Sequence, residues 1–423
     1  MDRSRPTEAR TEEEIVAAVH FAHERGTRLR PVGSEGSKSG INTNPGTSLH
    51  LEPYRQVVSL EGSLVTAESG IHIGRLQSHL REHSLIIPTM GEWQFATLGG
   101  TLGTATHGGS AHYGNLATSV RHLRMVTGTG DVVSLTPTDP DFAHAAVSLG
   151  AMGILSTVTL ECVPRFSLQL DTDVIPFHAY RQDPVAQESR SEFHASVWAP
   201  EAGRVIRYAA DRVPDPARAG KREQRFGLRN AMTTLMSRRL HLHAGVSNAV
   251  FRRRVVGDGS DILSPLAVSP RTAWTRVLVN EARGRLAAEL AVPASRAGDT
   301  LDRLATLVRR FPRVLNNPLG LRMTAGDAFS LSPATGSAPT FWIDIFYDDK
   351  PAFTTALAEL AVAVGARCHW GKTLALSPDI LRDRYPAWDA FREARARFDP
   401  AEIFANPFTD RLGLTGTRRG HHD

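Results

Sequence analysis

The sequence predicts an α+β protein with more than one domain, on three observations. The chain has 423 residues, too many for one hydrophobic core, so two or three domains are expected. Up to about residue 165, short strand-like apolar segments are mixed with amphipathic helices. Beyond that point longer strand-like runs such as FSLQLDTDVIP alternate with helical stretches such as AGDTLDRLATLVRRF, which indicates a second unit.

The first region supplies clear element signals. A helix is expected in TEEEIVAAVHFAHERG, where Thr11 and Glu14 form a capping-box pattern. Another is expected in IHIGRLQSHLREHS, which places Ile73, Leu76 and Leu80 on one face. Strands are expected at RLRPV, SLHL, VVSL and LVTAESG.

Composition excludes several classes of protein. Hydrophobic residues make up 41% and charged residues 22%, as in ordinary globular proteins. There is no apolar run long enough for a transmembrane segment and no apolar signal core at the N-terminus. The two cysteines, Cys162 and Cys368, cannot build a disulfide framework or a zinc cluster, and no H-E-x-x-H metal motif is present. We therefore expect a cytoplasmic protein with no bound metal.

The strongest chemical signal is the glycine-rich stretch ATLGGTLGTATHGGSAHYGNLATSV at 96–120. Glycine lets the backbone approach a ligand closely, and successive free N–H groups attract anionic oxygens. Neither a Walker loop nor a dinucleotide G-x-G-x-x-G fingerprint in a strand-to-helix context is present. The residues alone leave two interpretations open: a loop for a phosphate-bearing cofactor, or a structural turn region.

Five segments in order carry a resemblance to a known family: RPVGSEGSKSGI, SLVTAESGIHIGRLQSHL, ATLGGTLGTATHGG, SLGAMGIL and HWGK with FDPAEIFANP. The chain resembles the aldonolactone and alditol oxidases of the vanillyl-alcohol-oxidase flavoprotein superfamily. The resemblance covers nearly the whole chain and is strongest at 25–165 and 360–410.

The resemblance implies a two-domain α+β flavoprotein. Residues 1–165 and a returning C-terminal segment, 366–423, would bind FAD, and residues 166–365 would form a substrate-binding cap with an antiparallel sheet. The loop 33–37 would lie on the pyrophosphate, 99–109 along the pyrophosphate and flavin ring, and 151–155 at the ring edge or adenine side. The implied cofactor-binding residues are Pro31, Gly33, Ser34, Glu35, Gly36, Ser37, Gly99, Gly100, Thr101, Gly103, Thr104, Thr106, His107, Gly108, Gly153 and Ile154.

The implied activity is oxidation of an alcohol or lactone-type substrate by hydride transfer to flavin N5, with dioxygen or another electron acceptor reoxidising the flavin. One departure concerns the flavin itself. The family's first loop usually reads G-x-x-H-S, and its histidine is bonded to the flavin. Gly36 stands at that position, so we expect noncovalent FAD.

Other departures concern the substrate. The family's Glu-x-Arg pair becomes Gly320 and Arg322 here, while Glu289 is kept. Ala287 and Phe346 stand where polar groups are expected. Because unpaired substrate hydroxyl groups are costly in a pocket, we expect a substrate less polar than an alditol.

Three residues are implied as catalytic candidates: Arg322, Lys372 and His369. Positive charge from Arg322 and Lys372 would stabilise the anionic reduced flavin. His369 could act as a general base, although a structural histidine packed beside Trp370 is the favoured interpretation. His107 is expected to make a structural hydrogen bond near the cofactor. The base is left open among these groups and water.

The basic stretch at 221–256 raises a different possibility, a surface for nucleic acid or anionic lipid. A solvated helical excursion of the cap is favoured, because the interleaved aromatic residues typical of nucleic-acid grooves are missing. No nucleic-acid partner is therefore expected. Two alternatives to an oxidase stay open: a flavin-binding protein that has lost activity, and a dehydrogenase that uses an acceptor other than oxygen.

Overall fold

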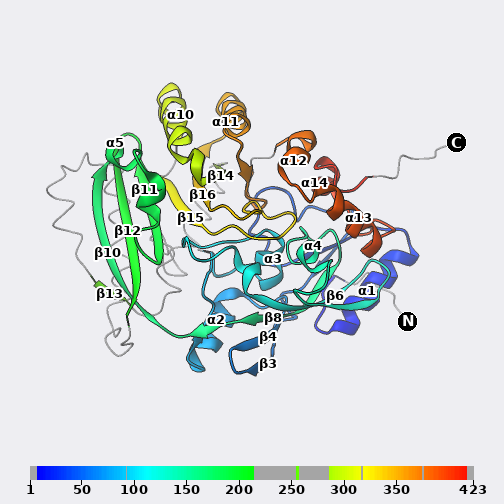
Figure 1. The fold of residues 1–423 in the computed structure, drawn as a ribbon. Coiled ribbons are helices and arrows are strands. Elements are labelled where there is room, and N and C mark those ends of the chain that lie inside the picture. The colour runs from blue at the N-terminus through cyan, green and yellow to red at the C-terminus, as the bar shows by residue number, and fades with distance from the viewer. Residues whose placement is uncertain are drawn as a thin grey trace.

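The structure is a computed structural model that describes residues 7–91, 93–213, 254–256, 285–315, 318–373 and 376–416. It is an α+β, two-domain fold built around two large antiparallel sheets, one of five strands and one of eight (Figure 1). This confirms the predicted fold class.

The smaller sheet lies in the N-terminal part of the chain. Its strand order is β3 (Val57–Glu61), β4 (Leu64–Glu68), β8 (Ile154–Glu161), β6 (Val120–Val126) and β7 (Val132–Leu135). A parallel pair, β1 (Leu29–Val32) and β2 (Thr47–His50), and a short pair, β5 (Leu85–Ile86) and β9 (Val163–Pro164), accompany it. The helices of this part are α1 (Glu12–Glu24), α2 (Ile73–Glu82), α3 (Leu98–Gly103), the 3-10 turn η1 (Leu116–Ser119) and α4 (Phe142–Ala145).

The first helix forms as its sequence predicts, with one difference at the cap. The Thr11 side chain accepts a hydrogen bond from the Glu14 amide at 3.2 Å. The reciprocal bond is displaced: the Glu14 carboxylate accepts from the Arg10 amide at 2.6 Å, one residue before the cap. Ile15, Ala18, Val19 and Ala22 share the buried face of this helix.

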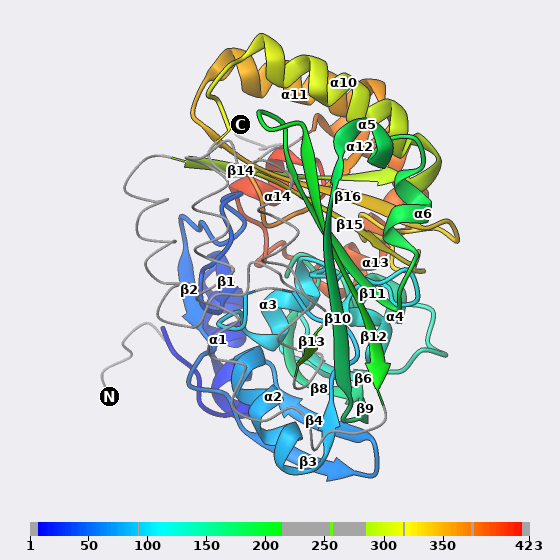
Figure 2. The ribbon, with the colours of Figure 1, turned by 90° about the vertical axis from the view of Figure 1, so that its left-hand side faces the viewer.

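The larger sheet forms most of the cap. Its strand order is β13 (Arg254–Val256), β10 (Ser167–Pro176), β12 (Arg204–Val213), β11 (Phe193–Ala199), β15 (Leu319–Thr324), β16 (Thr340–Asp348), β14 (Arg285–Pro293) and β17 (Arg367–Cys368). The accompanying helices are α5 (Phe177–Tyr180), α6 (Pro184–Glu188), the 3-10 turn η4 (Ala294–Arg296), α10 (Ala297–Arg310) and α11 (Pro351–Ala363). Helices α10 and α11 lie side by side over one face of β14, β15 and β16, so the other face of these strands is left for the site (Figures 1 and 2).

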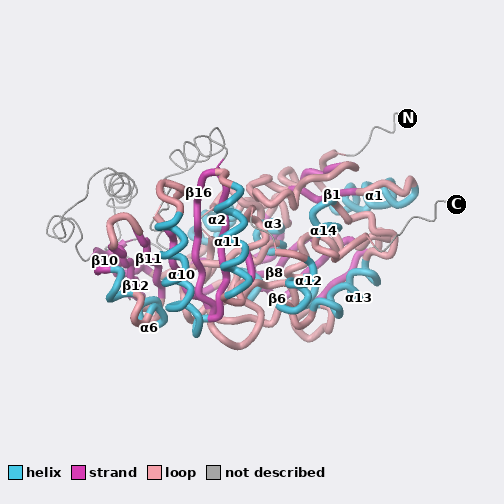
Figure 3. The backbone as a smooth tube through the Cα atoms, turned by 90° about the horizontal axis from the view of Figure 1, so that it is seen from above, coloured by secondary structure: helices cyan, strands magenta, loops and turns pink. Residues whose placement is uncertain are grey.

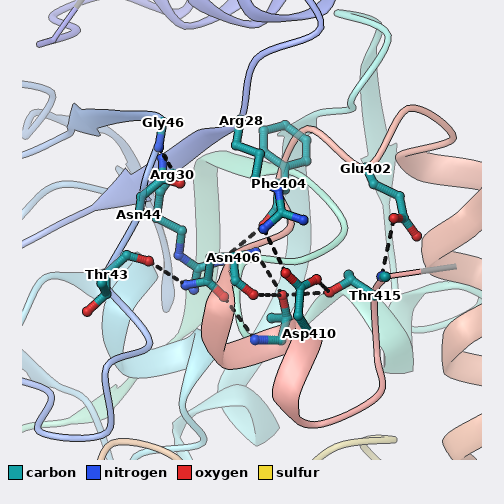
Figure 4. Close-up of polar contacts among 12 residues, drawn as sticks. Arg28, Arg30, Thr43, Asn44, Gly46, Glu402, Phe404, Asn406, Asp410 and Thr415 are labelled. Carbon is teal, nitrogen blue, oxygen red and sulfur yellow. Dashed lines mark hydrogen bonds and ion pairs between the residues drawn. The ribbon is translucent and has the colours of Figure 1, made fainter. Parts of the chain in front are cut away.

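The C-terminal helices α12 (Pro378–Arg384), α13 (Trp388–Phe398) and α14 (Pro407–Arg411) return to the N-terminal part of the chain (Figure 3). The Leu29 amide donates to the Ile403 carbonyl at 2.7 Å, which joins β1 to this segment. The side-chain nitrogen of Asn406 donates to the carbonyls of Ile41 and Thr43 at 2.8 and 2.9 Å. The Arg28 guanidinium forms an ion pair with the Asp410 carboxylate at 2.7 Å (Figure 4). The FDPAEIFANP motif therefore holds the loop that follows β1.

The domain boundaries at 165 and 365 remain predictions. Strand β17 shows that the C-terminal segment also adds an edge strand to the cap sheet. None of the helices in the described ranges is long and apolar enough to cross a membrane. Cys162 and Cys368 are buried and free. The basic stretch at 221–256 lies outside the described residues except for strand β13.

Candidate active site

A cavity of about 470 Å³ lies where the glycine-rich loops of the N-terminal part meet the cap sheet. All the predicted cofactor residues line it except Gly108 and Ile154, and so do all three predicted catalytic residues. Gly108 packs against Thr89 and Met90, and Ile154 is fully buried in β8. One cavity thus collects residues from all three predicted segments of the chain.

The loop at 33–37 forms one wall of the cavity. A Cβ atom at Gly33 would stand 2.1 Å from the Thr97 hydroxyl oxygen, so no larger residue fits without rearrangement. Glu35 has a φ of 52°, a left-handed conformation that residues other than glycine rarely adopt and that often marks a functional loop. Its carboxylate accepts from the Asn42 side chain at 3.3 Å.

The tip of this loop meets the HWGK segment. The Lys38 amide donates to the Gly371 carbonyl at 2.8 Å. A Cβ atom at Gly36 would lie 3.2 Å from the indole nitrogen of Trp93, so the Trp93 side chain faces the space beside Gly36.

The loop at 99–107 forms the adjoining wall. It begins in α3, where the Thr97 hydroxyl oxygen accepts from the Gly100 amide at 3.3 Å. Gly153 also lines the cavity, and a Cβ atom there would come within 2.6 Å of the Val126 carbonyl oxygen. Glycines therefore alternate with threonines along this wall, and backbone N–H groups and hydroxyl groups are both suited to a phosphate-bearing ligand.

The opposite wall is a row of residues across the cap sheet. Residues directly opposite one another in an antiparallel sheet share a face. The register pairs Glu289 of β14 with Asp344 of β16, Asp344 with Gly320 of β15, and Gly320 with Val197 of β11. In the neighbouring rows, Ala287 pairs with Phe346, and Arg322 pairs with Trp342.

Two carboxylates and two cations meet on this wall. The Lys372 ammonium lies 3.4 Å from an oxygen of Asp344 and 3.8 Å from an oxygen of Glu289. Arg322, Asp344 and Glu289 are each less than a tenth exposed, and Arg322 and Asp344 interact electrostatically. Buried charges persist only when they are paired, and this cluster balances two negative groups against two positive ones.

The pKa values follow from this arrangement. Burial raises the pKa of Asp344 above its ordinary value, against the attraction of Lys372. Burial would also raise the pKa of Glu289, but Lys372 and His107 together hold it below its ordinary value. For Lys372, burial acts to lower the pKa, and the carboxylates of Asp344 and Glu289 raise it overall. Lys372 is therefore a firmly held cation at neutral pH.

The two histidines of the site, His107 and His369, both make hydrogen bonds to neighbouring residues. His107 stacks on Trp342 with ring centroids 3.6 Å apart, and its ring nitrogens bond to Glu289 at 3.1 Å and to the Gly108 carbonyl at 2.9 Å. Burial lowers the pKa of His369 to about 3. Its Nδ1 accepts from the Gly371 amide at 3.0 Å, so the neutral ring carries its proton on Nε2 and is poorly placed to take another.

His107, Glu289 and His369 also bring their ligand atoms within 4.8 Å of one another, as a metal site would. The Lys372 ammonium is already 3.8 Å from Glu289 and supplies the positive charge there. A divalent cation would be repelled by it, so we assign no metal to these residues.

Some of the lining carries no local signal in the sequence. Asp344 is one such residue, because its place in the wall depends on strand pairing. Arg30 also lines the cavity and donates to the Leu149 carbonyl at 2.6 Å, and burial lowers its pKa to about 10. Its only signal in the sequence is a charged residue within the apolar step RLRPV.

The fold and the cavity, together with the family matches and relatives that follow, define a two-domain, FAD-dependent oxidoreductase acting on CH–OH donors. Residues 7–136 match the FAD binding domain, and residues 158–412 match the D-arabinono-1,4-lactone oxidase family. The chain belongs to this family, within the vanillyl-alcohol-oxidase flavoprotein superfamily. The resemblance stated from the sequence is confirmed.

Curated relatives span nearly the same length. The chain is 29% identical to L-gulono-1,4-lactone dehydrogenase of Mycobacterium tuberculosis, over 96% of this chain and 95% of that protein. It is 25% identical to L-gulonolactone oxidase of Bos taurus, over 95% and 93%. Among solved structures, cholesterol oxidase from Brevibacterium sterolicum and a solvent-stable cholesterol oxidase share the fold, each at 16% identity, with TM-scores of 0.70 and 0.74. Both alignments cover 96% of this chain, and 93% and 94% of those chains, respectively.

Proposed function

We propose that the chain holds FAD noncovalently in this cavity and oxidises a hydroxyl group of a lactone-type substrate. The proposal rests on one observation: two walls of different chemical character face each other across one cavity. Glycine-rich loops with accessible backbone line one wall, and the cluster of Arg322, Lys372, Asp344 and Glu289 lines the other. The first suits the phosphates of a dinucleotide, and the second suits a small polar substrate.

Noncovalent attachment is supported by Gly36. It has no side chain that could bond to the flavin, and Trp93 faces the space beside it. The cofactor would be held by the loops at 33–37 and 99–107.

FAD supplies the redox chemistry when it is bound, as an acceptor of the hydride from the carbon that bears the hydroxyl group. The chain's own residues orient the substrate and set the charge of the site. Arg322 and Lys372 place hydrogen-bond donors in the cavity beside the acceptors Asp344 and Glu289, so a polar ligand meets both kinds of partner there. His107 and His369 stabilise the cap wall, because His107 hydrogen-bonds to Glu289 and His369 accepts from the Gly371 amide.

The substrate class is supported by the names of the relatives, which include L-gulono-1,4-lactone dehydrogenase and putative D-arabinono-1,4-lactone oxidase. On the cap side, the apolar residues Val197, Ala287, Pro318 and Phe346 line the cavity beside the charged cluster. These apolar positions offer no partner to a hydroxyl group, so a lactone with fewer hydroxyl groups than an alditol fits better.

Colour and acid precipitation test the cofactor. The purified protein should be yellow, or turn yellow with added FAD, and acid should release the flavin into the supernatant. Flavin retained in the acid pellet would contradict noncovalent attachment, and a protein that never takes up FAD would contradict the whole proposal. Anaerobic mixing with a panel of aldonolactones, alditols and simple alcohols should bleach the flavin fastest with a lactone.

The electron acceptor separates two versions of this function, because the relatives are named both oxidases and dehydrogenases. Admission of air to the lactone-reduced protein distinguishes them. Return of the yellow colour within seconds indicates an oxidase. Slow return in air, with fast return on adding a quinone or a dye, indicates a dehydrogenase.

A further inference from the structure

Asp344 occupies the centre of the row that faces the cavity. It lies between Glu289 on β14 and Gly320 on β15, and it lines the cavity itself. A carboxylate with a small side chain at this place reaches a ligand only because its neighbours leave room.

The two carboxylates of the row differ in how they are held. One oxygen of Glu289 bonds to His107 at 3.1 Å, and the other lies 3.8 Å from Lys372. Among the described residues, Asp344 has one hydrogen-bond partner, the Lys372 ammonium at 3.4 Å from its Oδ1. Glu289 is thus engaged on both oxygens, whereas Asp344 keeps accepting capacity for a ligand.

Gly320 provides the space. A Cβ atom added there would stand 3.3 Å from the Asp344 Cβ and 4.0 Å from its Oδ2. A larger side chain on β15 would compete with Asp344 for the same part of the wall. The absence of a carboxylate at 320, expected from the sequence to leave the wall less polar, is therefore offset by one on the neighbouring strand.

We propose that the Asp344 carboxylate binds a hydroxyl group of the substrate, with Lys372 holding the carboxylate in place. The hydroxyl group donates its hydrogen bond to Asp344, and the apolar lining packs against the rest of the ligand. This assignment rests on the proposed function, because it takes the ligand to be a hydroxy-lactone.

The test measures binding without turnover. Protein loaded with FAD is reduced with dithionite under nitrogen, so a lactone can bind but cannot be oxidised, and affinity is measured by calorimetry. The ligands are L-gulono-1,4-lactone and its deoxy counterparts, each lacking one hydroxyl group. The variants are Asp344→Asn and Asp344→Ala, with Asp348→Asn, on the same strand but outside the cavity lining, as the matched control.

For Asp344→Ala we expect binding of the lactone to weaken about ten- to hundred-fold, the effect of losing a hydrogen bond to a charged group. One deoxy-lactone should bind the wild type equally poorly and should lose nothing further in the variant, which identifies the hydroxyl group concerned. Asp344→Asn should weaken binding in the same direction. FAD affinity should stay within about two-fold of the wild type.

Lactone affinity unchanged in both variants would overturn the assignment while leaving the proposed function intact. Equal weakening for every ligand in the panel, together with loss of FAD, would also overturn it, because Asp344 would then be structural. A wild type that binds FAD but no lactone would refute the proposed substrate itself.

A swap variant gives an independent check. Gly320→Glu combined with Asp344→Gly moves the carboxylate back to β15 and removes the crowding Cβ. It should bind the lactone at least tenfold better than Asp344→Gly alone. A swap variant that keeps FAD but shows no such gain would contradict the proposal.

Discussion

Gly33 shows how closely the loop at 33–37 is fitted to its neighbours. The Cβ of an alanine there would lie 2.1 Å from the Thr97 hydroxyl oxygen, far inside contact distance. We expect Gly33→Ala to lower the free energy of unfolding by about 1–3 kcal/mol, as for other overpacked sites, and to weaken FAD binding because the loop must shift. Chemical denaturation and titration of the apoprotein with FAD measure the two effects.

Gly298 is the matched control, because it lies in α10 and its added Cβ would meet nothing closer than the Arg181 carbonyl oxygen at 3.4 Å. Gly298→Ala should leave FAD affinity unchanged and raise stability slightly, as alanine favours helix. Equal FAD affinity in Gly33→Ala and the wild type would show that this wall does not touch the cofactor.

His369 links the site to the pH dependence of stability. Its pKa is held near 3 by burial, below the ordinary value of 6.5, so the unfolded chain binds its proton first. Stability from this group is present above pH 6.5 and is lost as the pH falls toward 3, by at most about 1.4 kcal/mol per pH unit. His369→Asn should reduce that slope between pH 6.5 and 5, measured by urea denaturation at several pH values.

The exposed His112 is the control for that series, as His112→Asn changes an imidazole outside the cavity. A slope in His369→Asn as steep as in the wild type would mean that His369 is not kept neutral in the folded protein.

At the scale of elements, local sequence patterns predicted individual helices and strands but not the row of paired residues across β14, β15 and β16. Hydrophobic periodicity and turn residues predicted helix α1 and strands β1 to β4 correctly, because those signals are local. The place of Asp344 opposite Gly320 and Glu289 depends on pairing with residues 24 and 55 positions earlier in the chain. Local patterns do not determine such a register, so the sequence gives no reason to single out Asp344, although it does mark the apolar Phe346 two residues later.

Asp399 stabilises the turn that leads into the last helix. Its two oxygens accept from the amides of Ile403 at 3.0 Å and Phe404 at 2.9 Å, and the residue is fully buried. Asp399→Ala leaves both amides without an acceptor, so we expect a loss of about 1–3 kcal/mol in the free energy of unfolding. Burial raises the pKa of Asp399 to about 6, so the measurement belongs at pH 8, where the carboxylate is ionised.

Asp389 offers a contrast on the preceding helix, since its ion pair with Arg382 is about half exposed. Such pairs contribute about 0–1 kcal/mol, so Asp389→Ala should change stability little. A loss in Asp399→Ala no larger than in Asp389→Ala would show that the turn does not depend on these two hydrogen bonds.

At the scale of the whole molecule, the cavity exists only when distant parts of the chain meet. The loop at 33–38 comes from near the N-terminus, Arg322 and Asp344 come from the cap, and Lys372 follows the last cap strand. Glycine loops and the HWGK segment could be recognised in the sequence because each is a compact motif. The way these motifs meet could not be predicted, because it depends on contacts between distant residues. One example is the hydrogen bond from the Lys38 amide to the Gly371 carbonyl, which joins residues more than 300 positions apart.

The C-terminal segment should therefore be required for FAD binding although most of it lies away from the cavity. A chain ending at Phe398 loses the Ile403 carbonyl that accepts from β1, the Asn406 amide that holds the loop at 41–43, and the Asp410 partner of Arg28. Buried backbone groups of the N-terminal part would lose their partners, which costs more than the lost contacts alone. We expect no saturable FAD binding and no cooperative unfolding transition in this truncated chain.

Asn406→Ala separates positioning of the loop from collapse of the fold. It removes the two hydrogen bonds to the carbonyls of Ile41 and Thr43, and the side-chain cap on the Thr409 amide of α14, but keeps the Ile403 and Asp410 contacts to the N-terminal part. We expect a folded protein with a lower melting temperature and weaker FAD binding, whereas Arg382→Ala, at an exposed ion pair, should match the wild type in both. If the truncated chain binds FAD as tightly as the full chain, the N-terminal loops are preorganised without their C-terminal partners. The cavity would then depend on local sequence far more than these contacts indicate.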